Sequence, residues 1–402
     1  MMNWIGFLWG GQSAPLFAAV ICTAVAGTPP QATVQSADAT VLPAPPPLPT
    51  MPPVVDPANL YSEAGAGHLS PAVANALPRV YVPNVLSGSV DVIDPATMRV
   101  VDHFPAGHNP QHVIPSWDLK TLWVAGSVQG HRFPGSLVPI DPTTGKPGAT
   151  VHVRDAYNLY FMPDGSAAIV VAEALKELEF RDPQTMELKA TLPVPQCAGI
   201  NHADFAPDGS YVIFTCEFRG GGLVKIDLAG RRILGYLRLS RSGMPQDIRI
   251  APDGKVFYVA DMMADGVYLV DGDTFKEVGF IPTGHGAHGL TISRDGKKLY
   301  VSNRGVRGGS RPHGEGSVSV IDFATRKVEA QWPMPGGGSP DMGNVSADGS
   351  TLWLSGRLDD VVYAIDTTSG EVKSIAVGHQ PHGVAVWPQP GRYSLGHTGN
   401  MR

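Results

Sequence analysis

Short runs of alternating apolar and polar residues recur along the chain, and one kind of run ends seven times in Ile-Asp or a close equivalent. The seven runs are Ser89–Asp94, Ser136–Asp141, Glu177–Asp182, Gly222–Asp227, Gly266–Asp271, Ser317–Asp322 and Val361–Asp366. Their closing aspartates are 41 to 51 positions apart, which is the period of a propeller blade. No segment keeps a helical period over about ten residues, so a helical fold is excluded.

The same order of strands returns around each run. A first strand meets a tight turn such as Pro252-Asp253-Gly254, a second strand follows, the Ile-Asp strand is third, and a fourth completes the sheet. Four alternating strands joined by hairpins form one propeller blade. The sequence therefore predicts an all-β fold over residues 79–390, a seven-bladed β-propeller with four-stranded antiparallel blades.

The two ends of the repeat array complement each other. The first repeat lacks its innermost strand and begins at Arg79–Pro83, whereas the last repeat adds an innermost strand at His382–Trp387. Pairing the two gives a composite blade of three N-terminal strands and one C-terminal strand. This 3+1 closure removes the free sheet edges, so we expect a closed ring.

Three segments lie outside the repeats. Residues 1–26 carry no charged side chain and end in a small-x-small pattern, which predicts a signal peptide or an uncleaved membrane anchor. The protein is therefore expected to be exported: periplasmic, at the cell surface or secreted. Residues 27–78 form a proline-rich linker and lead-in that favours extended polyproline geometry. The C-terminal tail, residues 391–402, carries His397 and Met401 and is expected to fray or pack loosely.

The composition agrees with an all-β protein, because 47 Gly and 37 Pro supply turns and 43% hydrophobic residues supply a core. The net charge is −6 and no basic stripe is present, which excludes the electrostatic attraction that nucleic-acid binding requires. No later stretch is long and apolar enough to span a bilayer, so a membrane association is expected only through the N-terminal segment.

Several of these strands resemble a known family. Tyr81-Val82-Pro83-Asn84, Tyr258–Asp261 and Tyr300–Asn303 resemble the YVTN signature of bacterial and archaeal surface or periplasmic propellers, and Gly378–Gly383 is similar to that family's strand-entry motif. The resemblance implies an extracytoplasmic seven-bladed propeller. At the level of the fold it extends to the N-terminal propeller of nitrous oxide reductases and to lactonases, so it does not settle an activity.

Histidines concentrate in the loops that enter the first strand of each repeat, which emerge on one face of a propeller and surround its channel. The candidate metal ligands there are His112, His202, Asp247, His285, His288, Asp341, His379 and His382. Imidazoles with carboxylates suit copper, zinc or iron. The alternative is that duplicated blades copied a tolerated residue.

The positions of these residues along their strands decide whether their side chains can face the same channel. His288, Asp341 and His382 share one register, whereas His112, His202 and Asp247 lie one residue later. Side chains alternate along a strand, so the two sets converge only if a bulge compensates.

Arginines and carboxylates gather in other loops of the same face. The candidate ligand-binding residues are Arg219, Arg304, Arg357, Glu217, Asp261, His131 and His313. Arginine forks could hold a small anion or a partner surface, and the alternative is a solvated loop with local ion pairs.

Cys197 and Cys216 lie on adjacent predicted strands of one blade. Together with His202 and Met244 they could form a soft copper site, but in an exported protein a disulfide is favoured.

The sequence leaves three alternative hypotheses for the function. The first is a tethered binding or scaffold module that presents its His- and Arg-rich face to a protein or cell-envelope partner. The second is a copper-type redox or accessory protein that uses the histidines at the channel mouth. The third is a lactone hydrolase, and whether any reaction is catalysed stays open. Cys-x-x-Cys-His is absent, which excludes covalently attached c-type haem.

Overall fold

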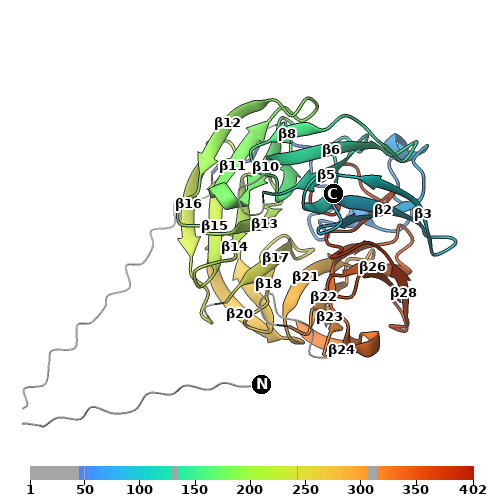
Figure 1. The fold of residues 1–402 in the computed structure, drawn as a ribbon. Coiled ribbons are helices and arrows are strands. Elements are labelled where there is room, and N and C mark those ends of the chain that lie inside the picture. Colours follow the sequence, from blue (N-terminus) through green and yellow to red (C-terminus); the bar gives the residue numbers. More distant parts are fainter. Residues whose placement is uncertain (1–44, 49, 129–133, 242, 307–314) are drawn as a thin grey trace, which may run out of the picture. The chain divides into compact units, whose positions relative to one another are not determined.

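The strands form seven separate sheets arranged in a ring, in a computed structural model that describes residues 45–402 except 49, 129–133, 242 and 307–314 (Figure 1). The predicted seven-bladed all-β propeller is confirmed. The segment 1–26 lies outside the described residues, and so do His131 and His313. Among the residues that are described, no helix is long and apolar enough to cross a membrane.

The sheets are named here by their innermost strand, and their strands follow from the axis outward. The composite blade contains β29 (Ala385–Trp387), β1 (Arg79–Asn84), β2 (Ser89–Asp94) and β3 (Arg99–Pro105). The β4 blade contains β4 (Pro110–Pro115), β5 (Leu122–Gly126) and β6 (Gly135–Asp141), with β7 (Lys146–Pro147) and β8 (Val151–Val153) both paired to β6. The β9 blade contains β9 (Asn158–Phe161), β10 (Ala168–Ala172), β11 (Glu177–Arg181) and β12 (Leu188–Pro193).

The other four blades each contain four strands in sequence order. The β13 blade contains β13 (Ile200–Phe205), β14 (Tyr211–Cys216), β15 (Gly222–Asp227) and β16 (Arg232–Leu237). The β17 blade contains β17 (Pro245–Ile250), β18 (Val256–Asp261), β19 (Gly266–Asp271) and β20 (Lys276–Pro282). The β21 blade contains β21 (Ala287–Ile292), β22 (Lys298–Asn303), β23 (Ser317–Asp322) and β24 (Lys327–Pro333). The β25 blade contains β25 (Pro340–Val345), β26 (Thr351–Gly356), β27 (Val361–Asp366) and β28 (Val372–Ala376).

Local chemistry explains these strands and turns. The outermost strand β24 alternates exposed and half-buried residues along its length, as expected for a strand with one face toward solvent. The turn before β18 shows why the Pro-Asp-Gly pattern recurs. Gly254 has φ +70°, where a Cβ would be strained, and the Asp253 carboxylate accepts a hydrogen bond of 3.0 Å from the Lys255 amide.

The ring closes as predicted from the first and last repeats. In the composite blade Arg79 pairs with Trp387, Val80 with Val386 and Tyr81 with Ala385, all antiparallel. The closing strand is shorter than expected, because β29 begins at Ala385 and His382 lies just before it. The described polypeptide therefore joins its first and last strands in one sheet.

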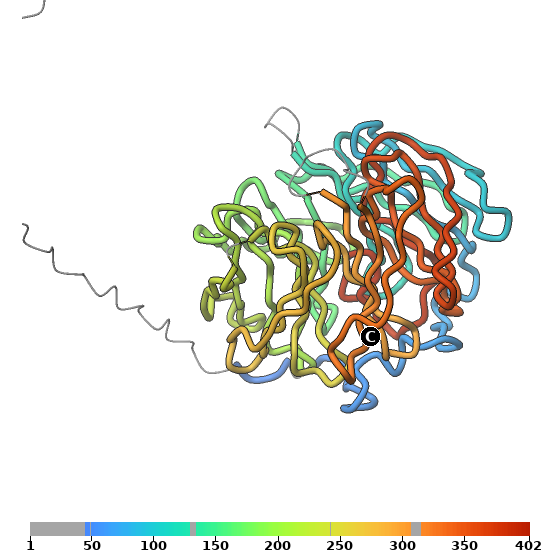
Figure 2. Tube along the Cα trace, turned by 90° about the horizontal axis from the view of Figure 1, so that it is seen from below, coloured from blue at the N-terminus to red at the C-terminus, as the bar shows by residue number. Residues whose placement is uncertain are grey.

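The segments outside the repeats cover the end of the ring where the turns between first and second strands lie. In the lead-in, which includes the 3-10 turns η1 (Ser62–Ala64) and η2 (Pro71–Val73), the Leu60 amide donates to Pro252 O and the Leu77 amide donates to Pro142 O. These residues, blue in Figure 2, run along one face of the disc. This face is called the bottom face below.

The expectation that the C-terminal tail frays is wrong. All but one of its residues, 391–402, are buried. Asn400 Nδ2 and Arg402 Nη2 each lie 2.7 Å from Asp204 Oδ1 in β13, and the His397 amide donates to Leu159 O in β9. The tail enters the channel from the bottom face. It is held there because the buried Asp204 carboxylate accepts hydrogen bonds from Asn400 and Arg402.

Candidate metal and ligand site in the central channel

One polar residue from each blade faces the channel near the entry of its innermost strand. Going round the ring, these buried residues are His382, His112, Asn158, His202, Asp247, His288 and Asp341. Four are imidazoles in ring contact with their neighbours. The centroids of His112 and His382 lie 4.7 Å apart, and those of His112 and His202 lie 5.4 Å apart. His288 completes the ring at 6.5 Å from His202 and 6.0 Å from His382.

The bulge that the two registers require is present in five blades. In each, two residues of the first strand face one residue of the second strand at the channel end, as between Ile200 and Ala203 of β13 or between Ala287 and Leu290 of β21. A bulge re-aims side chains beside a functional site. His202 is the second residue after the paired residue Ile200, and His288 is the first residue after the paired residue Ala287. The bulge brings both side chains to the same channel.

The lower group of imidazoles consists of His112, His202 and His397. Their ligand atoms all lie within 4.8 Å of one another. The Nε2 atoms of His112 and His202 are 3.4 Å apart. His112 Nδ1 lies 2.9 Å from Tyr157 O, so Nδ1 carries the proton and Nε2 presents its lone pair. His202 Nδ1 has no hydrogen-bond partner among the described residues.

His397, from the tail, has a different hydrogen-bond arrangement. Its Nδ1 lies 2.9 Å from Asn158 Nδ2, and Asn158 Oδ1 accepts from the Leu159 amide. Nδ1 therefore accepts, and the neutral ring carries its proton on Nε2, 3.6 Å from Asp247 Oδ2. Coordination through Nε2 would require the Asn158 amide to turn, so that its oxygen faces a protonated Nδ1.

The upper group consists of His288, Asp341 and His382, again with ligand atoms within 4.8 Å of one another. His288 Nδ1 lies 2.6 Å from Asp341 Oδ1, although not at a hydrogen-bonding angle. Neither ring nitrogen of His382 has a hydrogen-bond partner among the described residues. Arg304 Nη2 contacts Asp341 Oδ2, and Arg357 Nη1 lies 3.9 Å from the same oxygen. The upper group therefore already has its carboxylate paired with cations.

Burial sets the protonation of this cluster. It lowers the pKa of His112 and of His288 to about 4, and it holds the pKa values of His202, His382 and His397 well below the usual range. Burial acts in the opposite direction on Asp341, but Arg304 and His288 outweigh it and hold the pKa of its carboxyl well below the usual range. At neutral pH the imidazoles are neutral, which is the form that binds metal ions.

A cavity of about 200 Å³ opens beside the upper group, and His288 and His382 form part of its lining. Arg304 and Arg357 line the cavity from the β21 and β25 blades. Glu173 and Glu217 line it from the β9 and β13 blades, with the aromatic side chains of Tyr157 and Phe218. The cavity therefore has a cationic wall and, on other blades, an acidic and aromatic wall.

The two glutamates influence each other. Glu173 lies in the 3-10 turn η3 (Glu173–Leu175), and Glu217 directly follows β14. Burial and the nearby Glu217 carboxylate raise the pKa of Glu173 well above its usual range. Burial also raises the pKa of Glu217, whose Oε2 accepts a hydrogen bond of 2.9 Å from Asn201 Nδ2. The pair therefore holds a proton to higher pH than an isolated glutamate does.

Other predicted site residues lie away from the channel cluster. The His285 side chain is 52% exposed and pairs with Asp265, and the His379 side chain is 74% exposed and pairs with Asp360. Arg219 is exposed, and the Asp261 carboxylate accepts backbone amides of its own loop, including that of Met263. These residues occupy the predicted loops but do not line the cavity.

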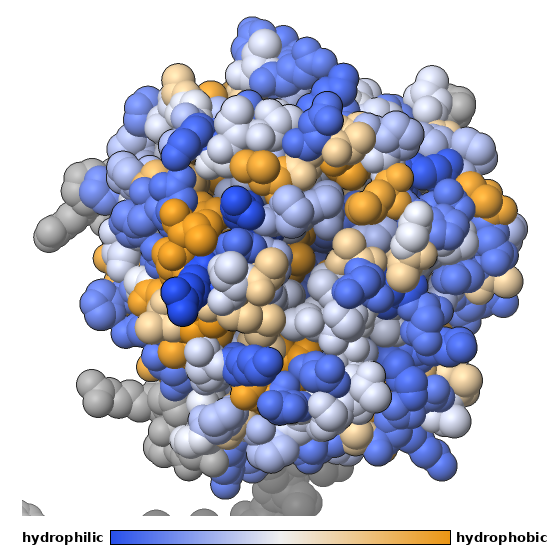
Figure 3. All heavy atoms as spheres, turned by 90° about the vertical axis from the view of Figure 1, so that its right-hand side faces the viewer, coloured by the Kyte–Doolittle hydropathy of each residue, from blue (hydrophilic) through white to orange (hydrophobic). Residues whose placement is uncertain are grey.

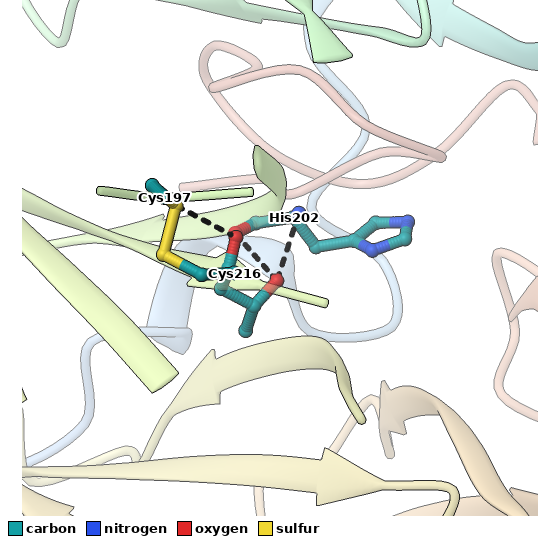
Figure 4. Close-up of a disulfide and its surroundings, with 4 residues drawn as sticks. Cys197, His202 and Cys216 are labelled. Atoms are coloured by element: carbon teal, nitrogen blue, oxygen red, sulfur yellow. Dashed lines mark hydrogen bonds between the residues drawn. A yellow bond between two sulfur atoms is a disulfide. The ribbon is translucent and has the colours of Figure 1, made fainter. Parts of the chain in front are cut away.

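Cys197 and Cys216 form a disulfide, so the soft copper set with thiolate ligands is not formed in this structure. Figure 4 shows the His202 ring pointing away from the two sulfur atoms, and the His202 amide donates to Thr215 Oγ1 at 3.0 Å. Cys216 ends β14, but Cys197 lies three residues before β13 and not on a strand as predicted. The disulfide therefore joins β14 to the segment that leads into the bulged strand of His202.

Sequence reasoning missed three contributors. His397 was expected to be in a loose tail, and no repeat places the tail in the channel. Glu173 was not considered, although it follows β10 as Glu217 follows β14, and this equivalence could have identified it. Tyr157 belongs to a strand entry in the array, but the entry carries no histidine to mark it.

Comparisons with known proteins address the family and the fold. A family model described as YNCE-like beta-propeller matches residues 47–391. The uncharacterised protein YwcC of Lactococcus lactis is 29% identical over 182 residues, 40% of this chain and 52% of that protein. Antigen Lp49 of Leptospira interrogans is 25% identical over 38% of this chain and 36% of that protein. The chain thus matches about half the length of the first relative and about a third of the second.

Three solved structures share the fold at 17% sequence identity. Hydrazine synthase of Kuenenia stuttgartiensis has a TM-score of 0.58 over 75% of this chain and 93% of that chain. The dihydro-heme d1 dehydrogenase NirN has a TM-score of 0.57 over 77% and 75%. A Bacteroides uniformis protein provisionally assigned as a 6-phosphogluconolactonase has a TM-score of 0.60 over 76% and 98%. At this identity the likeness shows the fold alone.

Proposed function

The chain belongs to the YNCE-like β-propeller family, and on that premise we propose that it is an exported binding protein whose central channel holds a transition-metal ion. His112 and His202 are the central ligands, and His397 is the third once the Asn158 amide turns. Three imidazoles suit zinc or copper. The bound ion would supply Lewis acidity or, if it is copper, a redox centre.

The observation that carries this proposal is the separation of 3.4 Å between the two Nε2 atoms. Two nitrogens that each lie about 2.05 Å from a tetrahedral ion are about 3.4 Å apart. The Tyr157 carbonyl fixes the His112 tautomer that such a ligand needs. The alternative at the same separation is a long N–H···N hydrogen bond between two neutral rings, and metal analysis distinguishes the two.

The energetics favour an added ligand for the cluster. A buried polar group without a partner costs about 1–3 kcal/mol. His202 Nδ1 and both ring nitrogens of His382 have no partner among the described residues. A metal ion bound at Nε2 of His202 would offset part of the cost of burying that ring.

Metal content tests the proposal. Protein purified from its native compartment, or loaded with Zn²⁺ or Cu²⁺ and then desalted, is expected to retain about one ion per chain. The double variant His112→Gln with His202→Gln should lose that ion, because it removes both central ligands. The control His379→Gln changes an exposed imidazole on the same face and should retain it. Thermal unfolding confirms that each variant is folded. A wild-type protein that retains no more metal than the double variant would contradict the proposal.

Export and tethering remain part of the proposal. The Cys197–Cys216 disulfide supports export, because disulfides persist in oxidising compartments. The scaffold hypothesis, with a protein or cell-envelope partner on the His- and Arg-rich face, stays a prediction. Figure 3 shows one side of the disc, where apolar residues lie in small groups separated by polar ones, so this side offers no single large apolar docking surface. The lactone-hydrolase hypothesis rests on the fold alone.

A further inference from the structure

The cavity beside His288 and His382 has two walls of opposite character, and the cationic wall carries donors that have no hydrogen-bond partner among the described residues. On the cationic wall, Arg304 is buried and its Nε has no partner among the described residues. Arg357 Nη1 likewise has no hydrogen-bond partner there and is 3.9 Å from Asp341. Asp341 therefore occupies only part of the donor capacity of the two guanidinium groups.

These arginine donors match a carboxylate. A guanidinium group presents its N–H donors in a planar fork that fits two carboxylate oxygens. Asp341 lies below the arginines and offsets part of their charge, so one small anion, rather than a phosphate with more than one negative charge, suits the remaining donors. Gln111 and Gln246 also line the cavity with neutral amides.

The other wall matches an ammonium group. Glu173 and Glu217 together carry less charge than two free glutamates, because burial raises the pKa of both and the nearby Glu217 carboxylate raises that of Glu173 further. A cation placed between them would favour their ionised forms. Tyr157 and Phe218 line the same wall, and aromatic faces attract ammonium groups.

We propose that this cavity binds a small zwitterion, an α-amino acid or a compound of similar size, with its carboxylate on Arg304 and Arg357 and its ammonium group between Glu173 and Glu217. The volume of about 200 Å³ admits a molecule of this size and is below the range typical of sites for drug-sized ligands. The inference goes beyond the metal site, since neither wall includes a proposed metal ligand, and it holds for protein with or without metal.

Calorimetry on chelator-treated protein tests the assignment with three matched probes: L-alanine, propionate, which lacks the amine, and ethylamine, which lacks the carboxylate. Alanine, or a larger amino acid from a panel of the twenty, is expected to bind at least tenfold more tightly than its two one-ended analogues. Each lost end removes a charge-assisted contact, and a tenfold change corresponds to about 1.4 kcal/mol. Propionate binding as tightly as alanine would overturn the ammonium half, and no binding by any amino acid would overturn the whole proposal.

Two variants locate the site. Arg357→Gln and Glu173→Gln should each weaken amino-acid binding at least tenfold, whereas Arg219→Gln, an exposed arginine outside the cavity, should leave it unchanged. Equal effects of Arg357→Gln and Arg219→Gln would contradict the placement. These measurements use metal-free protein, so the two proposals can fail separately. A protein that binds an amino acid but no metal ion would count against the metal centre alone. The reverse result would count against the zwitterion alone.

Discussion

A neutral imidazole carries one N–H donor and one acceptor nitrogen, and five such rings share the channel, each in ring contact with at least two of the others. Among the hydrogen bonds of the described residues, only those of His112 and His397 join a ring nitrogen of these five to a partner outside the cluster. The types and many of the positions of these residues could be predicted from the sequence, because His112, His202, His288 and His382 recur at equivalent strand entries. The tautomers of His112 and His397 could not, because their partners Tyr157 and Asn158 lie in a distant part of the chain.

The lowered pKa values predict a pH dependence of stability for metal-free protein. An imidazole with a lower pKa in the folded state binds fewer protons there than in the unfolded chain. Its contribution is present above about pH 6.5 and is lost as the pH falls toward 4. His112 and His288, each lowered to about 4, should each contribute about 3 kcal/mol over that range. Urea unfolding between pH 7 and pH 4.5 measures the slope.

The raised pKa values of Glu173 and Glu217 act in the opposite direction, so the comparison needs a variant. Replacing His112 and His288 by Asn removes the two imidazoles and leaves the glutamates. The variant should lose stability less steeply than the wild type as the pH falls. Equal slopes for the two proteins would show that burial does not lower these pKa values.

At the scale of the element, the bulged first strand and the C-terminal tail build the site. The offset between His202 and His288 could be counted along the sequence, and it made a bulge necessary if both faced the channel. The tail could not be placed in the same way. It belongs to no repeat, and its partner Asp204 is separated from Arg402 by 198 positions. A buried long-range ion pair leaves no periodic signal in the sequence.

Breaking this pair should be costly. Arg402→Ala leaves the fully buried Asp204 carboxylate with one charged partner fewer, and loss of one partner of a buried pair costs about 3–5 kcal/mol. The matched control is Lys146→Ala, which breaks the exposed pair with Asp102 and should cost at most about 1 kcal/mol. Urea unfolding of the two variants compares them. Equal and small losses would show that the tail is not held in the channel.

At the scale of the whole propeller, the closure of the ring and the covered bottom face give the channel a direction. The composite blade was predictable because the first repeat lacks the strand that the last repeat adds. The lead-in and the tail fill the bottom face, as the contacts of Leu60, Tyr61 and Arg402 show. The cavity lined by Arg357 and Glu173 therefore marks the side from which the proposed metal ion and small ligand would reach the imidazoles.

The central claim is that the lower imidazoles hold a metal ion, and anomalous X-ray scattering from crystals of the metal-loaded protein tests it most directly. Data collected on both sides of the zinc or copper absorption edge should give one strong peak about 2 Å from the Nε2 atoms of both His112 and His202. A peak elsewhere, or no peak in this channel although the crystals contain the metal, would contradict the account.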